Sequence, residues 1–116
     1  MDDFVCHTRS LEGSCALVSV SGELDLHTCH EFKKAVDDMR LGKPAHLVFD
    51  LSDVTYIDST ALGILVVLQR QVTEPVHLVV HRQHQRKLLH LTGLDGVFAV
   101  HASLDEAVAA AVGRAA

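Results

Sequence analysis

The sequence has no tryptophan, few other aromatic residues and few cysteines. Aromatic residues make up 4% of the 116-residue chain and hydrophobic residues 48%, so the core must be built mainly from aliphatic side chains. The three cysteines, Cys6, Cys15 and Cys29, are an odd number without a C-x-x-C spacing. This pattern argues against a disulfide framework and favours a reduced, cytosolic setting in which the cysteines act as small apolar residues.

An excess of positive charge and a long hydrophobic run are also missing. The formal net charge is −5 and no run of basic residues overrides it, which argues against nucleic-acid binding. The longest apolar run, Ala61 to Leu68, is too short to cross a bilayer, so we expect no membrane insertion. The chain begins with Met1, Asp2 and Asp3, unlike the basic start of a signal peptide, so we expect a cytoplasmic protein.

The length is that of one domain. A chain of 116 residues can bury a core of its own without disulfides or metals. No internal repeat, linker or low-complexity segment divides it. We therefore expect a single domain over residues 1–116, with a frayed tail at 113–116.

Hydrophobic periodicity predicts strands that alternate with helices, which is typical of a layered α/β domain with a mostly parallel inner sheet. The first two strands should form a hairpin around Gly13. Two helices should begin at capping boxes, Thr28 to Glu31 and Ser103 to Glu106. The expected strands are 4–8, 15–20, 45–51, 76–80 and 96–100, and the expected helices begin near 28, 59, 83 and 103.

The pattern also predicts where these elements end and which faces they bury. Ser21-Gly22 should end the second strand and Ser52-Asp53 the third, and Gly93 should cap the third helix. We expect the third helix to direct Leu88, Leu89 and Leu91 inward, and the last helix to bury the face of Leu104, Val108 and Val112.

A polar triplet, Asp58-Ser59-Thr60, separates the third strand from an apolar helix that runs to Gln71. Either Asp58 or Ser59 can cap this helix, because both side chains accept hydrogen bonds from the first free backbone N–H groups. Ser59 also places a hydroxyl where the helix dipole is positive, a position that tolerates a phosphate. No Glu or Gln completes a capping box here, so no local carboxylate should repel a phosphate from those N–H groups.

Other residues of this region have both a structural and a functional interpretation. Asp25 and Asp58 each follow a strand of one sheet, so we expect them to lie close together, as turn carboxylates or as part of a binding site. Thr60 is a weaker acceptor of phosphate or a space-filling residue. Gly63 stands in a helix interior, where Gly is unfavourable, so we expect close packing there, against the sheet or against a partner.

Metal binding and catalysis have weaker signals. Among nine histidines, the pairs His27 with His30 and His77 with His81 lack a Cys or carboxylate partner at a zinc-site spacing, so we expect no tight zinc site. The sequence has no G-x-S-x-G around Ser59, no P-loop and no G-x-G-x-x-G. We therefore expect no cofactor, and a substrate of a kinase rather than an enzyme.

Two motifs resemble a known family. The segments Gly22-Glu-Leu-Asp25 and Asp58-Ser-Thr-Ala-Leu-Gly63 are similar to those of STAS-domain anti-sigma factor antagonists, and the likeness extends from about Val18 to Val108. Ala61 is a departure, since the family usually has Gly there. The resemblance implies a mixed, mostly parallel sheet of four to five strands with four helices.

The resemblance also implies a function. Ser59 would be the phosphoacceptor, and Asp25, Asp58, Ser59, Thr60 and Gly63 would contact the partner. Unphosphorylated, the protein would bind an anti-sigma factor with serine-kinase activity, and phosphorylation would release it. The alternative is a constitutive STAS-type accessory or scaffold subunit of a transporter or signalling assembly, which needs the fold but no working phosphosite.

Overall fold

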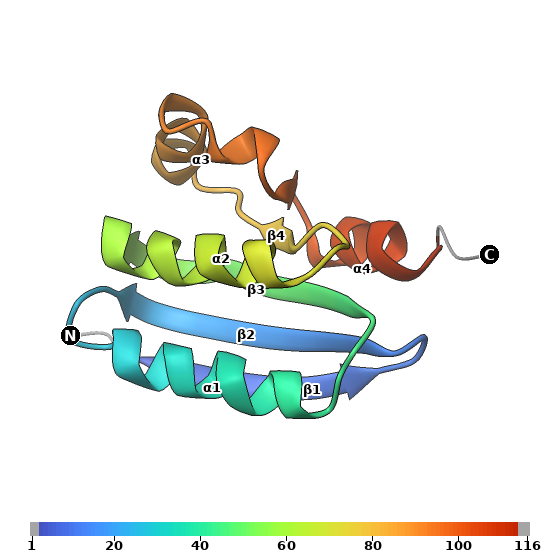
Figure 1. Cartoon of the computed structure of the whole chain (residues 1–116). Coiled ribbons are helices and arrows are strands. Elements are labelled where there is room, and N and C mark those ends of the chain that lie inside the picture. Colours follow the sequence, from blue (N-terminus) through green and yellow to red (C-terminus); the bar gives the residue numbers. More distant parts are fainter. Residues whose placement is uncertain (1–2, 114–116) are drawn as a thin grey trace.

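The computed structural model describes residues 3–113. They form five strands and four α-helices in an α/β fold, as the sequence predicts (Figure 1). Of the predicted tail at 113–116, residues 114–116 lie outside the described residues. The elements in chain order are β1 (Val5–Leu11), β2 (Cys15–Leu24), α1 (Cys29–Leu41), β3 (His46–Ile57), α2 (Ser59–Gln71), β4 (His77–Val79), α3 (Gln83–Leu91), the short 3-10 helix η1 (Leu94–Gly96), β5 (Ala99–His101) and α4 (Leu104–Val112).

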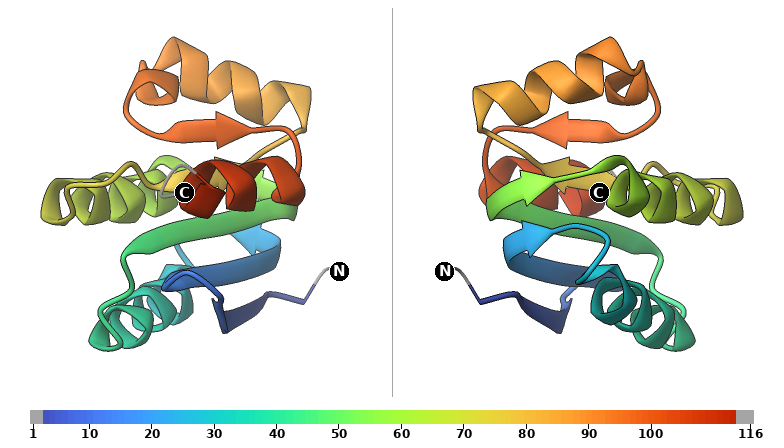
Figure 2. Two further views of the ribbon diagram at one scale, coloured as in Figure 1. Left: turned by 90° about the vertical axis from the view of Figure 1, so that its right-hand side faces the viewer. Right: turned by 90° about the vertical axis from the view of Figure 1, so that its left-hand side faces the viewer.

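The strands form one mixed sheet in the order β1-β2-β3-β4-β5. β1 pairs antiparallel with β2, which confirms the hairpin, and the remaining pairs are parallel. The helices pack on both faces of this sheet. The larger core joins one face to α1, α2 and α3, and a smaller core joins the other face to Ala107 and Ala111 of α4. Figure 2 shows α4 in front of β3 in one view and behind it in the other.

β2 and β3 are longer than the sequence predicts. Ser21 and Gly22 do not end β2, because a β-bulge at this point lets pairing with β3 continue to Leu24. Gly22 has a φ of +91°, which favours glycine, and an added Cβ would lie 2.6 Å from the carbonyl oxygen of Asp3. Ser52 and Asp53 likewise lie inside β3, which pairs with β2 as far as Ile57.

The buried faces of two helices also differ from the prediction. In α3, Leu89 is buried and Leu88 partly buried, as predicted, but Leu91 is 72% exposed. The polar Gln85 is buried in its place, because residues 85, 88 and 89 have the i, i+3, i+4 spacing of one helix face. In α4 the small residues Ala107 and Ala111 are buried in the smaller core, with Leu104 and Val112 packed against it, whereas Val108 is partly buried and is not part of this cluster.

Candidate functional site around Ser59

The site begins where β2 and β3 end side by side. These strands are parallel neighbours, with Leu24 in register with Ile57, so the loops that follow them meet at one edge of the sheet. The backbone N–H of Asp58 donates to the carbonyl of Leu24 at 3.2 Å. The predicted closeness of the segments that carry Asp25 and Asp58 is therefore confirmed.

Asp58, not Ser59, caps α2. Its Oδ1 accepts hydrogen bonds from the backbone N–H groups of Thr60 at 3.0 Å and Ala61 at 3.2 Å. Its Oδ2 accepts from the N–H of Leu26 at 3.2 Å, in the loop between β2 and α1. One carboxylate thus joins the start of α2 to the neighbouring loop. The expectation that no local carboxylate would repel a phosphate from the first N–H groups of the helix is therefore wrong, because the Asp58 carboxylate already binds two of them.

Ser59 is the first residue of α2 and is exposed to solvent. Its hydroxyl makes no hydrogen bond with any residue in the described range 3–113, because Asp58 already occupies the capping position. Thr60 is also exposed. The fold therefore presents a hydroxyl that is free to be modified or contacted, at the positive end of a helix.

Asp25 has a structural role in its own loop. Its Oδ1 accepts hydrogen bonds from the backbone N–H groups of His27 at 2.9 Å and Thr28 at 3.2 Å, as in an Asx turn. The carboxylates of Asp25 and Asp58 therefore fix the same loop from its two sides. The interpretation of Asp25 as a turn carboxylate is supported, and its half-buried side chain stays at the rim of the site.

The predicted capping box at Thr28 is wrong. Thr28 precedes α1 but its side chain accepts no hydrogen bond from the first turn of the helix. Its hydroxyl instead donates to the carbonyl of Glu23 at 2.8 Å and accepts from the N–H of Asp25 at 3.0 Å. Thr28 thus fastens the loop rather than the helix. In the second predicted capping box, Ser103 does cap α4, because its Oγ accepts a hydrogen bond from the N–H of Glu106 at 3.2 Å.

Gly63 is not closely packed against the sheet. It is exposed, and a Cβ added there would meet nothing within 4 Å. It lies on a groove of about 390 Å³ between α1 and α2. The intramolecular half of the Gly63 prediction is therefore wrong, and contact with a partner remains as a proposal. The groove is lined by Lys33, Val36, Asp37, Thr60, Gly63, Ile64, Val67, Leu68 and Gln71.

Three apolar side chains near the site are exposed, which was not predicted from the sequence. Leu26 is 62% exposed in the loop that Asp58 holds, Tyr56 is 51% exposed near the end of β3, and Val67 is 52% exposed on the groove. The sequence signal for Leu26 was its place directly after Asp25, the last residue of the first motif. Ala61, by contrast, is fully buried, so the departure from the family motif faces the core and not a partner.

The structure brings no group of three or more potential metal ligands together within residues 3–113. His77 and His101 lie with ring nitrogens 3.0 Å apart, on β4 and β5, rather than in the pairs read from sequence spacing. The absence of a tight zinc site stays a prediction. No helix in the described part of the chain is long and apolar enough to cross a membrane.

Comparison with known proteins assigns this arrangement to a family. The sequence model described as "Mlab, STAS domain" matches residues 7–108. The chain belongs to the STAS domain family. The match covers both motifs and all five strands except the beginning of β1.

Relatives of this STAS domain carry names that refer to one function. It is 30% identical to the anti-sigma-F factor antagonist RsfB of Mycobacterium tuberculosis over 108 residues, which cover 91% of this chain and 88% of the relative. It is 29% identical to an anti-sigma-B factor antagonist of Listeria monocytogenes over 86 residues, covering 72% of this chain and 75% of that one.

Solved structures show the same fold. The crystal structure of an anti-sigma factor antagonist from Mycobacterium paratuberculosis superposes with a TM-score of 0.87 at 31% identity, over 94% of each chain. The anti-sigma factor antagonist SpoIIAA in its unphosphorylated form has a TM-score of 0.68 over 88% of this chain and 92% of that one. At 14% identity, that second likeness supports the fold alone.

Proposed function

We propose that this STAS domain is an anti-sigma factor antagonist whose binding is switched by phosphorylation of Ser59. Unphosphorylated, it binds an anti-sigma factor in the cytoplasm through the surface around Ser59 and thereby frees a sigma factor. The partner carries a serine-kinase activity, phosphorylates Ser59 and is released. The observation that carries the proposal is an exposed Ser59 hydroxyl without an internal hydrogen bond, at the start of α2.

The contact surface follows from what the domain leaves uncovered. Leu26 and Tyr56 expose apolar area beside Ser59, and Val67 does so along the groove between α1 and α2. Gly63 gives a partner's backbone access to the same groove. A partner that covers Thr60, Gly63 and Val67 would bury one stripe of α2, since these residues have i, i+3, i+7 spacing.

Phosphorylation would act on this surface by charge and size. It adds about −1.5 to −2 charges at pH 7. Asp58 holds the N–H groups of Thr60 and Ala61, so the phosphate gains less from the helix start than free N–H groups would offer. The surface becomes more acidic, and a partner fitted to the bare hydroxyl would have to bury a dianion without a matching cation, which is unfavourable.

The chemistry belongs to the partner in this proposal. This chain contributes the acceptor oxygen of Ser59, and the kinase supplies ATP and the divalent cation that phosphoryl transfer requires. We assign no catalytic residue and no cofactor to the chain itself.

The test uses the purified domain and each serine-kinase anti-sigma factor encoded in the same genome. Incubation with ATP and Mg²⁺, followed by mass spectrometry, should place one phosphate on Ser59 with one of these partners. Thr60→Ala should leave that phosphate in place, and Ser59→Ala should abolish it while still binding. Tight binding to a partner without phosphorylation would instead support the constitutive accessory subunit.

A further inference from the structure

Charge is unevenly distributed along the chain. Residues 75–94 contain no Asp or Glu, but include Arg82, Arg86 and Lys87 together with four histidines. The formal charge of −5 therefore divides into +3 for this segment and −8 for the rest of the chain. The prediction from sequence missed this basic segment, because the negative net charge of the whole chain hides a local excess of positive charge.

The fold gathers this charge on α3. Arg82, which precedes the helix, and Arg86 and Lys87 within it are all exposed, as are His84 and His90. Neither arginine nor Lys87 forms an ion pair with any carboxylate of residues 3–113; the ion pair nearby joins His90 to Asp95. Like charges this close repel one another, so an acidic surface placed against them would relieve the repulsion.

An apolar side chain adjoins the basic residues. Leu91, 72% exposed, lies one helical turn from Lys87, and His84 lies on the same stripe. An apolar centre with a polar rim is the usual anatomy of a protein–protein contact, and arginine is enriched there. The rest of this domain carries −8, which disfavours approach of the polyanionic backbone of nucleic acid or of an anionic membrane.

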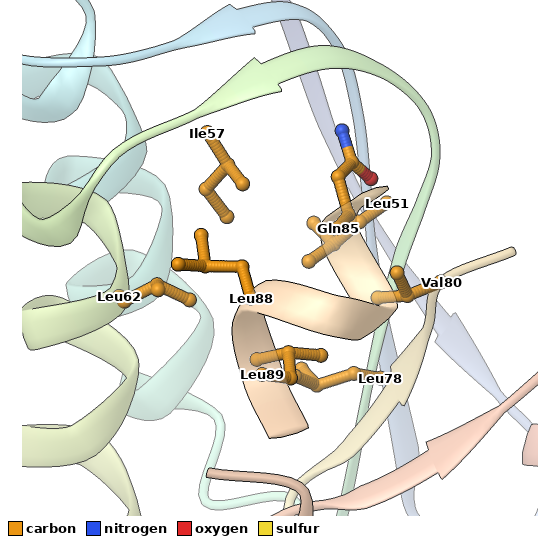
Figure 3. Close-up of a pocket in the computed structure, with 8 residues that line it drawn as sticks. All are labelled: Leu51, Ile57, Leu62, Leu78, Val80, Gln85, Leu88 and Leu89. Atoms are coloured by element: carbon orange, nitrogen blue, oxygen red, sulfur yellow. The ribbon is translucent and has the colours of Figure 1, made fainter. Parts of the chain in front are cut away.

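α3 is held firmly at the end of the molecule where Ser59 lies. Figure 3 shows Leu88 of α3 directed toward Ile57 and Leu62, which flank the Asp58–Ala61 segment. Gln85, 4% exposed, donates its Nε2–H to the carbonyl of Val54 at 2.9 Å. The cavity between these residues measures about 10 Å³, which leaves room for no ligand larger than a water molecule. A partner over Ser59 can therefore reach a rigidly placed α3.

We propose that the exposed surface formed by Arg82, directly before α3, and by the α3 stripe of His84, Lys87 and Leu91 is a second docking surface for an acidic patch on the same anti-sigma factor. This inference rests on the proposed function and adds to it the chemistry of the partner. The segment after β2 and the start of α2 supply the phosphorylation-sensitive contact, and α3 supplies a contact that phosphorylation of Ser59 does not alter. Arg82 and Lys87 therefore select among partners that all accept the same serine.

The test is a double charge reversal, Arg82→Glu with Lys87→Glu. Arg86 is left intact because its Nε–H donates to the carbonyl of Val80 at 2.6 Å and supports the fold. The matched control, Arg9→Glu with Lys43→Glu, makes the same change in net charge on exposed residues of β1 and of the loop before β3, neither of which forms an ion pair within residues 3–113. Affinity for the anti-sigma factor that phosphorylates Ser59 is measured by calorimetry at low and high salt.

We expect the α3 variant to bind about tenfold or more weakly than wild type at low salt, with a smaller difference at 0.5 M salt, because screening weakens charge pairs. The control variant should bind like wild type. Equal affinities of the α3 variant and the control would overturn this inference and leave the proposed function intact. Failure of the wild-type domain to bind any of the kinases would overturn both.

Two further measurements test whether α3 binds an anionic membrane or nucleic acid instead. Vesicles with 30% phosphatidylglycerol and a 20-base-pair DNA duplex are titrated with the wild-type domain and the α3 variant. We expect no binding to either. Binding of wild type that the α3 variant loses, together with an unchanged affinity for the kinase, would assign α3 to that other ligand and contradict the inference.

Discussion

The Asp58 carboxylate has two structural roles, one for each oxygen. Its Oδ1 caps α2, and its Oδ2 holds the N–H of Leu26, 32 residues away in the chain. Ser59 stays exposed because its neighbour does the capping. The residue that positions the Ser59 hydroxyl is therefore the one directly before it.

Replacing Asp58 tests this division. Asp58→Ala removes both tasks and should lower the free energy of unfolding by about 1–2 kcal/mol, the usual effect of losing an N-cap. Asp58→Asn keeps a capping oxygen but can turn an N–H₂ group toward the N–H of Leu26, so it should retain most stability while loosening the loop. Urea denaturation and amide hydrogen exchange at Leu26 and His27 measure the two effects. Equal stability of Asp58→Ala and wild type would refute the capping role.

Two glycines should respond in opposite directions to the same substitution. Gly22→Ala places a Cβ 2.6 Å from the carbonyl oxygen of Asp3 at a φ of +91°, so we expect a loss of roughly 1–3 kcal/mol. Gly63→Ala meets no atom within 4 Å on an exposed helix and should gain up to about 1 kcal/mol. Thermal unfolding compares them. If Gly63→Ala also weakens binding of the anti-sigma factor, the partner's backbone lies in the groove.

Cys6 should be an unreactive thiol. Burial, and secondarily the carboxylate of Glu31, raises the pKa of Cys6 to about 11. Because the pKa is higher in the folded than in the unfolded chain, protonated Cys6 contributes to the stability of the fold. This contribution is fully present below the ordinary thiol pKa of about 8.5 and is lost as the pH rises toward 11. Alkylation of Cys6 by iodoacetamide at pH 8 should therefore be at least about tenfold slower than in the urea-unfolded chain. Glu31→Gln should speed it modestly; equal rates in folded and unfolded protein would contradict the raised pKa.

At the scale of elements, sequence patterns located α2 better than the strands that lead to it. Apolar spacing and the polar triplet give the bounds Ser59 to Gln71 as observed. The ends of β2 and β3 were missed because Ser21, Gly22, Ser52 and Asp53 usually mark turns, whereas here pairing between the two strands and a bulge continue the ladder through them. Local propensity cannot reveal such non-local pairing.

In the candidate site, too, features set by local sequence could be predicted and features set by loop geometry could not. The identities of Asp25, Asp58 and Ser59, and their closeness, could be predicted, because the ends of parallel strands meet. The hydrogen bond from Leu26 to Asp58 and the true role of Thr28 could not, since each depends on loop geometry that no spacing encodes. Leu91 is three residues after Leu88, a spacing that shares a helix face, so its exposure could not be read from spacing alone; it follows from Gln85, and not Leu91, completing the buried face with Leu89.

The loop before α1 provides a prediction for this scale. Thr28→Ala should cost about 1 kcal/mol through the lost bonds to Glu23 and Asp25, and Thr28→Ser should restore most of it. Glu31→Ala should leave stability nearly unchanged, because no capping box includes it. Ser103→Ala is the control for a helix cap and should also cost about 1 kcal/mol. Denaturant titration decides; a large loss in Glu31→Ala would restore the capping box.

At the scale of the whole molecule, the surface proposed to switch is separate from the core that supports it. Ser59 and Thr60 are exposed, while the larger core beneath them contains Ala61, Leu62 and Leu65. A phosphate on Ser59 therefore changes surface charge without entering the core, and α2 keeps the cap that Asp58 provides. The domain should remain folded in both states and differ in what it binds.

Two variants bracket this behaviour. Ser59→Ala should bind the anti-sigma factor but resist inactivation by it, because the acceptor oxygen is gone. Ser59→Asp should weaken binding less than phosphate does, since it carries less charge and fewer acceptor oxygens.

The most direct measurement pairs the melting temperature with the affinity for the cognate anti-sigma factor, in phosphorylated and unphosphorylated protein. We predict melting temperatures within a few degrees of each other, together with a fall in affinity of about 100-fold or more on phosphorylation, as expected when a dianion has no matching cation in an interface. A domain that unfolds when Ser59 is phosphorylated, or that keeps its affinity for the kinase, would contradict the proposed switch.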